Sequence, residues 1–308
     1  MYDVVILTDY RYENPVKKNW YINQVLKEDQ LLLEAIRKKG LTVCKKDWNC
    51  KKFDWQKTRS AIFRSTWDYF DKFDEFFEWK EKNKKKLFFI NSSKIIDWNI
   101  NKIYLKELSK KGINIPDSIF IQKGDKIDLQ KLFDKSQFTT AILKPNISGA
   151  ARHTYKIENS ELKNFEIIFR ELISEKDMIF QKFINNIITE GEISLIMIGG
   201  KHTHSVKKKA KKGDFRVQDD HGGTVANYNP TKEEIIFAQN CIKKCPEKPL
   251  YARVDIIYDN DNKLALNELE LIEPELWFRE HPPAAEKLAV EIKNYLFEIK
   301  KTSNSISS

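Results

Sequence analysis

The chain has 308 residues and a formal net charge of +9, from 54 Lys and Arg against 45 Asp and Glu. Hydrophobic residues make up 41% and aromatic residues 12% of it, which excludes a wholly disordered chain. No apolar run reaches the roughly 18 residues of a membrane-spanning helix, and the stretch 1–10 has the pattern of a buried strand rather than a secretory signal. We therefore expect a cytoplasmic protein of two domains, with no membrane partner.

The positive charge is spread over short lysine runs, of which the stretch 207–212 is the densest. Such runs commonly cover a solvated face, and this one lacks the interleaved aromatic side chains on which nucleic-acid bases stack. Nucleic acid is therefore not an expected partner, whereas a basic cleft for an anionic small molecule agrees with the charge. The stretch 207–212 is either a solvated face or a lid that faces phosphate.

The four cysteines, Cys44, Cys50, Cys241 and Cys245, form no CxxC pair, and no histidine stands at a zinc-finger offset from them. A structural zinc site is therefore not expected. We expect reduced, partly buried thiols, as in a reducing compartment.

Strands and helices alternate in the N-terminal third of the sequence. The expected strands are 3–7, 41–44, 61–63 and 87–90, and the expected helices are 25–39 and 73–80. This alternation is typical of a small parallel α/β unit.

The rest of the chain mixes helices with paired strands. Expected strands are 139–143, 178–184, 192–198, 201–208, 251–258 and 264–271, and expected helices are 99–111, 161–174, 231–244 and 283–300. The glycine pair 199–200 makes 192–208 a hairpin. We divide the chain into an N-terminal α/β domain (1–98), a central subdomain (99–185), a C-terminal subdomain (186–300) and a flexible tail (301–308).

Charged residues alternate with apolar ones on the strands 251–258 and 264–271. Arg253 and Asp255 share one face of the first strand, and Glu268 and Glu270 share one face of the second. A short turn joins the strands, so these faces can coincide. Three clustered carboxylates repel each other unless a cation compensates them, and oxygen ligands of this kind suit Mg²⁺. The alternative is a surface hairpin with solvated charges, which the strongly apolar intervening residues disfavour.

Two loops carry further candidate anion-binding groups. Lys144 ends an apolar strand ahead of the small-residue loop 146–151, whose backbone N–H groups could approach phosphate. Arg216 stands in the loop 213–223, where it could clamp an anion or occupy an ordinary surface turn. The chain contains neither a G-x-x-x-x-G-K-[ST] nor a G-x-G-x-x-G motif.

The order of these motifs resembles the ATP-grasp superfamily, on its glutathione synthetase and D-alanine–D-alanine ligase side. It runs through Lys102, the Lys-Pro loop 144–151, the stretches 181–184 and 190–192, G-x-x-R at 213–216, R-x-D at 253–255 and E-x-E at 268–270 followed by Pro274. The segments 64–69, 213–218 and 268–274 resemble the branch that holds D-cycloserine-forming cyclo-ligases. The resemblance implies an α/β fold with an N-terminal parallel domain, a central lid subdomain and a C-terminal antiparallel-sheet subdomain.

The resemblance also implies binding residues for ATP and metal. Those for ATP are Lys102, Lys144, Ser148, Gly149, Gln181, Lys182, Phe183, Glu190 and Glu192. The lysines 102 and 144 would contact the phosphates, the stretch 181–183 the adenine, and Glu192, or else Glu190, the ribose. Asp255, Glu268 and Glu270 would ligate two Mg²⁺ ions, with Mn²⁺ as an alternative metal.

Two arginines have implied catalytic roles, and two positions depart from the family pattern. Arg253 and Arg216 would stabilise the acyl phosphate and the tetrahedral species that follows it. Glu270 stands where the relatives usually have Asn, which adds charge to the metal strand. Ser194 stands where glutathione synthetases have Arg, which puts the phosphate contacts there in question.

The substrate candidates lie at the end of the strand 61–63. Arg64, with Trp67 and Asp68, could grip an amino-acid-like carboxylate, because ligands of open α/β sheets sit beyond the carboxyl ends of strands. Alternatively, Arg64 pairs locally with Asp68 and the aromatic residues pack. Glu273, beside Pro274, is a further acidic substrate candidate or a helix cap.

We expect an ATP-dependent carboxylate–amine ligase for a small amino-acid-like substrate, acting between two molecules or within one. It would make an acyl phosphate that a nucleophile then attacks. The alternatives are a small-molecule kinase and a nucleotide- or nucleic-acid-binding module without catalysis. A homodimer is expected only by analogy with relatives.

Overall fold

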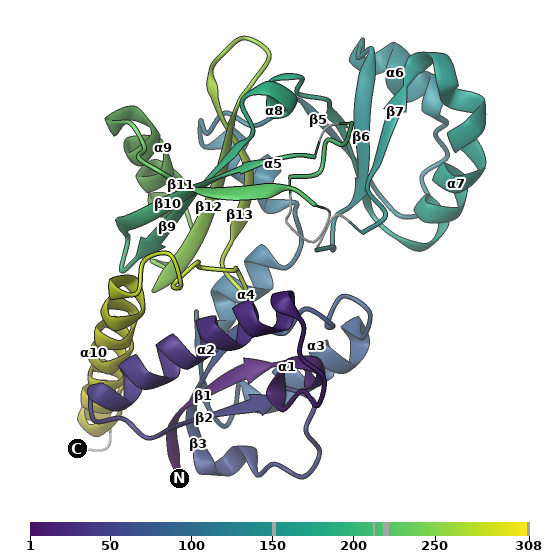
Figure 1. The fold of residues 1–308 in the computed structure, drawn as a ribbon. Helices are drawn as coiled ribbons and strands as arrows, with labels where there is room; N and C mark the ends of the chain where they lie inside the picture. Colours follow the sequence, from purple (N-terminus) through teal and green to yellow (C-terminus); the bar gives the residue numbers. More distant parts are fainter. Residues whose placement is uncertain (150–151, 212, 218–221, 307–308) are drawn as a thin grey trace.

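The computed structural model describes residues 1–149, 152–211, 213–217 and 222–306. They form three sheets, each with its own covering helices, in three units that meet at one place (Figure 1). Within these residues, no helix combines the length and the apolar character needed to cross a membrane. The four cysteines are free, and only Cys241 is fully buried.

The N-terminal unit is a parallel sheet in the order β2-β1-β3-β4. Its strands are β1 (Tyr2–Thr8), β2 (Val43–Asp47), β3 (Thr58–Ser65) and β4 (Phe88–Ile90). Its helices are α1 (Tyr10–Glu13), α2 (Trp20–Lys38), α3 (Phe73–Asn83) and α4 (Ser93–Asn99), with a 3₁₀ turn at Trp55–Lys57. The central strands are apolar on both faces because helices and loops cover both, which confirms the predicted parallel unit.

The central unit is an antiparallel sheet in the order β5-β8-β6-β7. Its strands are β5 (Ser118–Ile121), β6 (Thr140–Pro145), β7 (Tyr155–Glu158) and β8 (Met178–Lys182). The helices α6 (Leu129–Ser136) and α7 (Leu162–Glu175) cover one face of this sheet and share an apolar core with it (Figure 1). The segment also contains a 3₁₀ turn at Asn159–Glu161, whereas the preceding helix α5 (Tyr104–Lys110) packs in the core of the C-terminal sheet.

The C-terminal unit is an antiparallel sheet in the order β11-β10-β9-β12-β13. Its strands are β9 (Glu192–Ile198), β10 (Lys201–Lys209), β11 (Thr224–Tyr228), β12 (Tyr251–Tyr258) and β13 (Leu264–Glu270), with the short helix α8 (Asn186–Thr189) ahead of β9. Helix α9 (Lys232–Lys243) begins with a capping box of Thr231 and Glu234. The last helix, α10 (Pro283–Ile306), runs back beside α2 of the N-terminal unit (Figure 1).

Several sequence expectations need correction. The helix expected over 99–111 begins too early, because α4 ends at Asn99 and only Tyr104–Lys110 of that range forms the helix α5. Between them the Lys102 backbone N–H donates to the Asn146 carbonyl, which a continuous helix would not allow. The last helix also extends past the end expected at residue 300, since α10 continues to Ile306. The sequence patterns missed α1, α4, β5, α6, β7, α8 and β11.

Candidate active site

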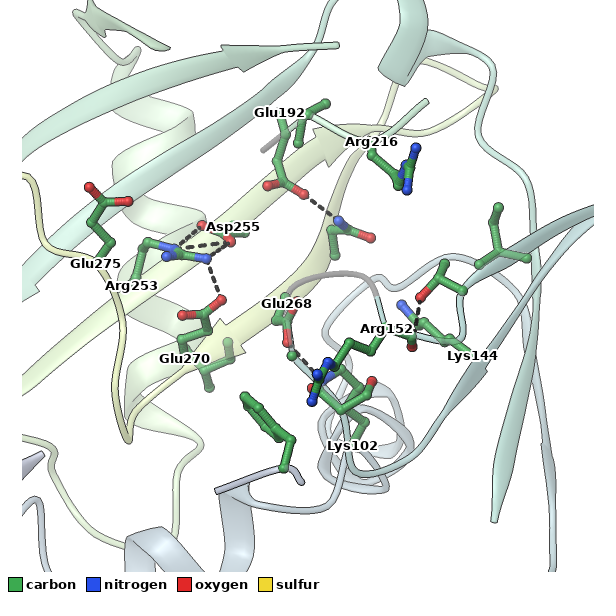
Figure 2. Close-up of a pocket in the computed structure, with 18 of the residues that line it drawn as sticks. Lys102, Lys144, Arg152, Glu192, Arg216, Arg253, Asp255, Glu268, Glu270 and Glu275 are labelled. Atoms are coloured by element: carbon green, nitrogen blue, oxygen red, sulfur yellow. Dashed lines mark hydrogen bonds and ion pairs between the residues drawn. The ribbon is translucent and has the colours of Figure 1, made fainter. Parts of the chain in front are cut away.

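A cavity of about 460 Å³ lies where the three units meet. Side chains from the N-terminal strand ends, from β6 and β8, and from the β9–β12–β13 face all line it (Figure 2). The cavity therefore depends on how the three sheets are placed against each other, and no single unit contains it.

The pair β12–β13 provides the acidic floor of the cavity. The ladder sets Arg253 opposite Glu270 and Asp255 opposite Glu268, which confirms the shared face predicted from their alternation. The intervening Val254 and Leu269 are buried in the core on the other side of the sheet. The alternation is therefore that of a half-buried sheet with a polar face toward the cavity, not that of a solvated hairpin.

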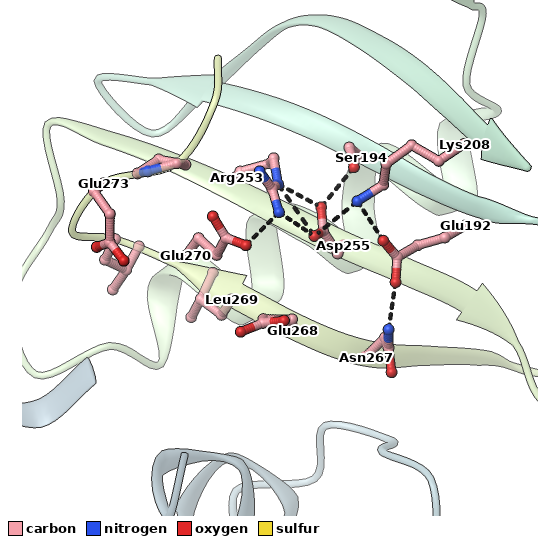
Figure 3. A network of polar contacts seen from close by, with 12 residues as sticks. Glu192, Ser194, Lys208, Arg253, Asp255, Asn267, Glu268, Leu269, Glu270 and Glu273 are labelled. Carbon is pink, nitrogen blue, oxygen red and sulfur yellow. Dashed lines mark hydrogen bonds and ion pairs between the residues drawn. The ribbon is translucent and has the colours of Figure 1, made fainter. Parts of the chain in front are cut away.

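Each of these carboxylates has a cationic partner. Lys102 Nζ lies 2.9 Å from Glu268 Oε1 (Figure 2), and Lys208 Nζ lies 3.2 Å from Asp255 Oδ2 (Figure 3). Arg253 Nη2 lies 2.8 Å from Asp255 Oδ2 and also pairs with Glu270. With their oxygens turned to these cations, no three His, Cys, Asp or Glu side chains in the described part of the chain are gathered closely enough to hold a metal ion.

Burial and these pairings move the pKa values in opposite directions. Burial favours the neutral form of Asp255, but Arg253 and Lys208 outweigh it and lower the pKa of Asp255 to about 2. Burial raises the pKa of Glu270 to about 8, because Arg253 only partly offsets it and the neighbouring Glu268 and Asp255 add to the rise. Arg253 therefore only partly offsets the repulsion that Glu270 meets from the neighbouring carboxylates. Oxygen donors whose mutual repulsion is incompletely compensated fit Mg²⁺.

Two lysines approach the floor from the central side of the cavity. Lys102 Nζ donates to the Ser148 carbonyl at 2.6 Å in addition to its pairing with Glu268. Lys144, at the end of β6, lines the cavity, and burial lowers its pKa to about 8. Ser148 and Gly149 also line the cavity, and a Cβ on Gly149 would lie 2.2 Å from the Phe70 ring. The small residue in this loop thus lets it pack against the N-terminal unit.

The stretch after β8 forms another wall. Gln181, Lys182 and Phe183 all line the cavity, as predicted for an adenine-binding segment. The buried Gln181 side chain donates to Ser118 Oγ at 3.0 Å, and its backbone lies in the ladder between β5 and β6.

Of the two candidate ribose acids, the structure places only Glu192 in the cavity. Glu192 is 4% exposed, accepts a hydrogen bond from Asn267 and pairs with Lys208. Glu190 is exposed, pairs with Lys207 at 3.6 Å and does not line the cavity. The assignment of Glu190 is therefore corrected in favour of Glu192.

The two arginines predicted to be catalytic are both at the cavity. Arg253 stacks over the Trp277 ring, with 5.2 Å between Cζ and the ring centroid. Arg216 lines the opposite side near Glu192 (Figure 2), and Asp214 accepts hydrogen bonds from its Nε and Nη2. The part of its loop at 218–221 lies outside the described residues.

Arg64 and Asp68 are not substrate-contacting residues in this structure. Arg64 is 3% exposed, donates from Nη1 to the Pro274 carbonyl at 2.8 Å and does not line the cavity. Asp68 accepts from Trp48 Nε1 at 2.7 Å and pairs with Lys72. Both predictions are corrected, because these groups hold the fold together.

Trp67 and Glu273 do line the cavity. The indole N–H of Trp67 donates to the Glu273 carbonyl at 3.0 Å, which joins the end of β3 to the segment after β13. These two of the four substrate candidates are thus on the cavity wall.

Several polar cavity residues were not singled out from the sequence, among them Lys208, Asn267 and Arg152. Lys208 stands in a run of three lysines, and strand alternation places it on the buried face of Val206 while Lys209 is exposed. Asn267 bonds Glu192, and Arg152 pairs with Asp71 at the cavity rim. The alternation of buried and exposed side chains along β10 is the signal that would have identified Lys208. Ser194, which stands where glutathione synthetases have Arg, also contributes to the site, since its hydroxyl donates to Asp255 Oδ1 at 2.6 Å.

Family models match the chain in two parts. The model described as D-cycloserine synthetase DcsG, N-terminal domain, matches residues 4–91. The model described as prokaryotic glutathione synthetase, ATP-grasp domain, matches residues 101–274. Together they cover both the N-terminal unit and the two units that form the rest of the cavity.

Two curated relatives match the chain at less than 30% sequence identity. The cycloserine biosynthesis protein DcsG of Streptomyces lavendulae is 23% identical over 256 residues, which cover 80% of this chain and 86% of that protein. A probable alpha-L-glutamate ligase of Vibrio atlanticus is 29% identical over 160 residues, which cover 51% of each chain.

Solved structures share the fold. The crystal structure of DcsG superposes with a TM-score of 0.83 at 19% identity, over 95% of this chain and 99% of that one. The D-alanine–D-alanine ligase of Bacillus anthracis gives 0.67 at 16% identity, over 98% and 100%. The ATP-grasp ligase PsnB, determined with a minimal precursor, Mg and ADP, gives 0.61 at 13% identity, over 94% and 98%.

Proposed function

The chain belongs to the ATP-grasp family, and from that premise we propose that it activates the carboxylate of a small amino-acid-like substrate and joins it to an amine. It is an ATP-dependent carboxylate–amine ligase, and ligases of this family use ATP with Mg²⁺. One observation carries the assignment of the site: Lys102 and Lys144 face the acidic floor of the same cavity that Arg253 enters.

The chemistry needs two stages because a carboxylate is a poor electrophile. Transfer of the γ-phosphoryl group of ATP to the carboxylate gives an acyl phosphate and ADP. Attack by the amine then forms the C–N bond as phosphate leaves. Bound Mg²⁺ would offset the charge of the anions that meet in the first stage, and Asp255, Glu268 and Glu270 are the residues that would hold it.

The protein's own groups would position the anions and stabilise the charge that develops. Lys102 and Lys144 would contact the phosphates, and Glu192 would accept from the ribose hydroxyls. Arg253 and Arg216 would donate to the acyl oxygen as it gains negative charge. Lys208, paired with both Asp255 and Glu192, would move toward phosphate when ATP takes these acids as partners.

The finer points of the proposal rest on the family resemblance. We propose two Mg²⁺ ions with Mn²⁺ as an alternative, a homodimer, and a location in the cytoplasm. A relative that matches over 80% of the chain carries the name of a cycloserine biosynthesis protein, so we propose closure within one molecule as the first reaction to test.

The proposal is tested by measuring ADP and orthophosphate release from ATP, with Mg²⁺ and a panel of amino acids, amines and O-substituted serines. Wild type should release both products with particular substrates, and Glu268→Gln should reduce the rate by at least about 100-fold, because the neutral amide is a poor ligand for Mg²⁺. Glu233→Gln, on the exposed face of α9, is the matched control. ADP without orthophosphate would instead indicate a kinase, whose product keeps the phosphoryl group.

The affinity for nucleotide should fall as the pH rises above about 8. Burial lowers the pKa of Lys144 to about 8, so the lysine loses in the alkaline range the charge that would attract phosphate. Above that point, the association constant should fall about tenfold per pH unit. Calorimetric titration with ADP and Mg²⁺ between about pH 7 and 9.5 measures this slope. Lys144→Arg, which stays charged throughout, should remove it, and a flat wild-type profile would contradict the prediction.

A further inference from the structure

The cavity continues past the acidic floor to a wall that belongs to the N-terminal unit. Tyr69 and Trp67 contribute to this wall, and Glu273 faces them from the segment that follows β13. In Figure 3, Glu273 extends the row of carboxylates that begins with Glu268 and Glu270. A substrate that meets the phosphate of ATP over the floor must therefore lie near Glu273.

The acidic side chains that line the cavity are paired with cations, with one exception. The pairs are Asp71–Arg152, Glu192–Lys208, Asp255–Lys208, Asp255–Arg253, Glu268–Lys102, Glu270–Arg253 and Glu275–Arg279. Within the described residues, the Glu273 carboxylate has no ion pair and interacts instead with the Tyr69 hydroxyl. It is thus the cavity acid whose charge the protein itself leaves without a partner.

The backbone around Glu273 is fixed from two sides. Trp67 Nε1 donates to the Glu273 carbonyl at 3.0 Å, and Arg64 Nη1 donates to the next carbonyl, that of Pro274, at 2.8 Å. Arg64 is itself held in the core beneath the Phe278 ring, 5.3 Å from its centroid. These contacts preorganise the carboxylate, so its lack of a cation does not come from a loose segment.

Burial removes solvation from the Glu273 carboxylate, and the Tyr69 hydroxyl and the more distant Lys102 compensate that loss only in part. An ammonium group of a ligand would restore that compensation, and nearby aromatic rings stabilise cations further. Tyr69, whose ring stacks on Phe76 at 4.5 Å between centroids, and Trp67 are both fixed next to the carboxylate. The wall therefore has the composition of a site for a small organic cation.

We propose that Glu273 binds the α-ammonium group of an amino-acid substrate, with Tyr69 and Trp67 as the aromatic sides of this ammonium site. The inference rests on the proposed ligase function and names the group that selects its substrate. Arg64 and Trp67 are then positioning residues, which act through the backbone of Glu273. The substrate's carboxylate would lie toward Arg253 and the phosphate of ATP, which orients the molecule along the cavity.

The test compares amino acids with the α-hydroxy acids of the same skeleton, in which a hydroxyl replaces the ammonium group. Binding of each compound is measured by calorimetry in the presence of Mg²⁺ and a non-hydrolysable ATP analogue, so no turnover is needed. Wild type should bind at least one amino acid about 10- to 100-fold more tightly than its hydroxy acid. Glu273→Gln should lose most of that preference and leave the affinity for the ATP analogue unchanged.

Two variants separate recognition from structure. Glu273→Asp keeps the charge and should restore part of the preference, whereas Glu233→Gln on the exposed face of α9 should behave as wild type. The proposal is overturned if wild type shows no preference for the ammonium compound or if Glu273→Gln keeps that preference. It is also overturned if Glu273→Gln lowers the affinity for the ATP analogue as much as the affinity for the amino acid. A wild type that prefers the ammonium compound but releases no ADP would contradict the ligase function and leave the ammonium site standing.

Discussion

Replacing Asp255 by asparagine should destabilise the protein by about 3–5 kcal/mol, because the substitution leaves buried cations without their counter-charge. The Asp255 side chain is 2% exposed and accepts from Ser194, Arg253 and Lys208. Asparagine keeps the size but loses the charge that holds Arg253 and Lys208. The same change should reduce ADP release by at least about 100-fold, because Asp255 is a proposed metal ligand.

Urea unfolding followed by far-UV circular dichroism measures the first effect, and the ADP assay measures the second at a temperature where the variant is folded. Asp261→Asn, in the exposed turn between β12 and β13, is the matched control and should change neither. A variant that is as stable as wild type would mean that the cations around Asp255 find other partners, and it would contradict the network described here.

The β12–β13 pair was predictable because its information is local. A period of two, with apolar residues on one face and Arg253, Asp255, Glu268 and Glu270 on the other, determines both the strands and the shared polar face. The alternation of strand and helix before residue 98 was equally informative about a parallel sheet. These features need no knowledge of distant contacts.

Arg64 shows where local information ends. The rule that ligands sit beyond strand ends correctly located the segment, and the neighbouring Trp67 does line the cavity. The sequence could not reveal that the segment after β13 would fold over Arg64, so that Pro274 accepts from it and Phe278 covers it. Contacts between residues some 200 positions apart decide whether a strand-end arginine is a ligand or a support.

The helix break at Lys102 and the buried position of Lys208 were missed for different reasons. Lys102 lies in a helix-like pattern, but its backbone and side chain both bond to the loop after β6, and this breaks the helix. Lys208 lies in a run whose charge suggests a solvated face, yet β10 turns that one lysine inward. In both cases tertiary contacts override a local pattern, as expected at a site that gathers charge.

The cations on the floor have a consequence for how ligands bind. Lys208 occupies Asp255 and Glu192 at once, although the first is a proposed metal ligand and the second a proposed ribose acceptor. Metal and nucleotide must each displace the same ammonium group from its partners. A displaced Lys208 gains phosphate as a new partner only when ATP is present, so metal alone should bind weakly and together with ATP strongly.

Lys208→Met should therefore shift two affinities in opposite directions. Two unit charges about 4 Å apart interact by about 4 kcal/mol near a protein surface. Losing even a third of such an interaction between Lys208 and Asp255 therefore corresponds to about a tenfold change in the affinity for a metal ion. We expect Mn²⁺ alone to bind about tenfold more tightly to the variant, as followed by the free-ion signal in electron paramagnetic resonance. The affinity for ATP should fall by about 10- to 100-fold, because phosphate loses a cationic partner.

The neighbouring Lys209→Met, whose side chain is exposed on the other face of β10, provides the control and should change neither affinity. If Lys208 only stabilised the fold, its removal would weaken Mn²⁺ and ATP together, in step with a lower midpoint of urea unfolding. Opposite signs cannot come from a general loss of stability, because destabilisation does not tighten binding to the native state. The two affinities thus distinguish two roles for Lys208. In one, its ammonium group exchanges carboxylate partners for phosphate; in the other, it only fills a buried position.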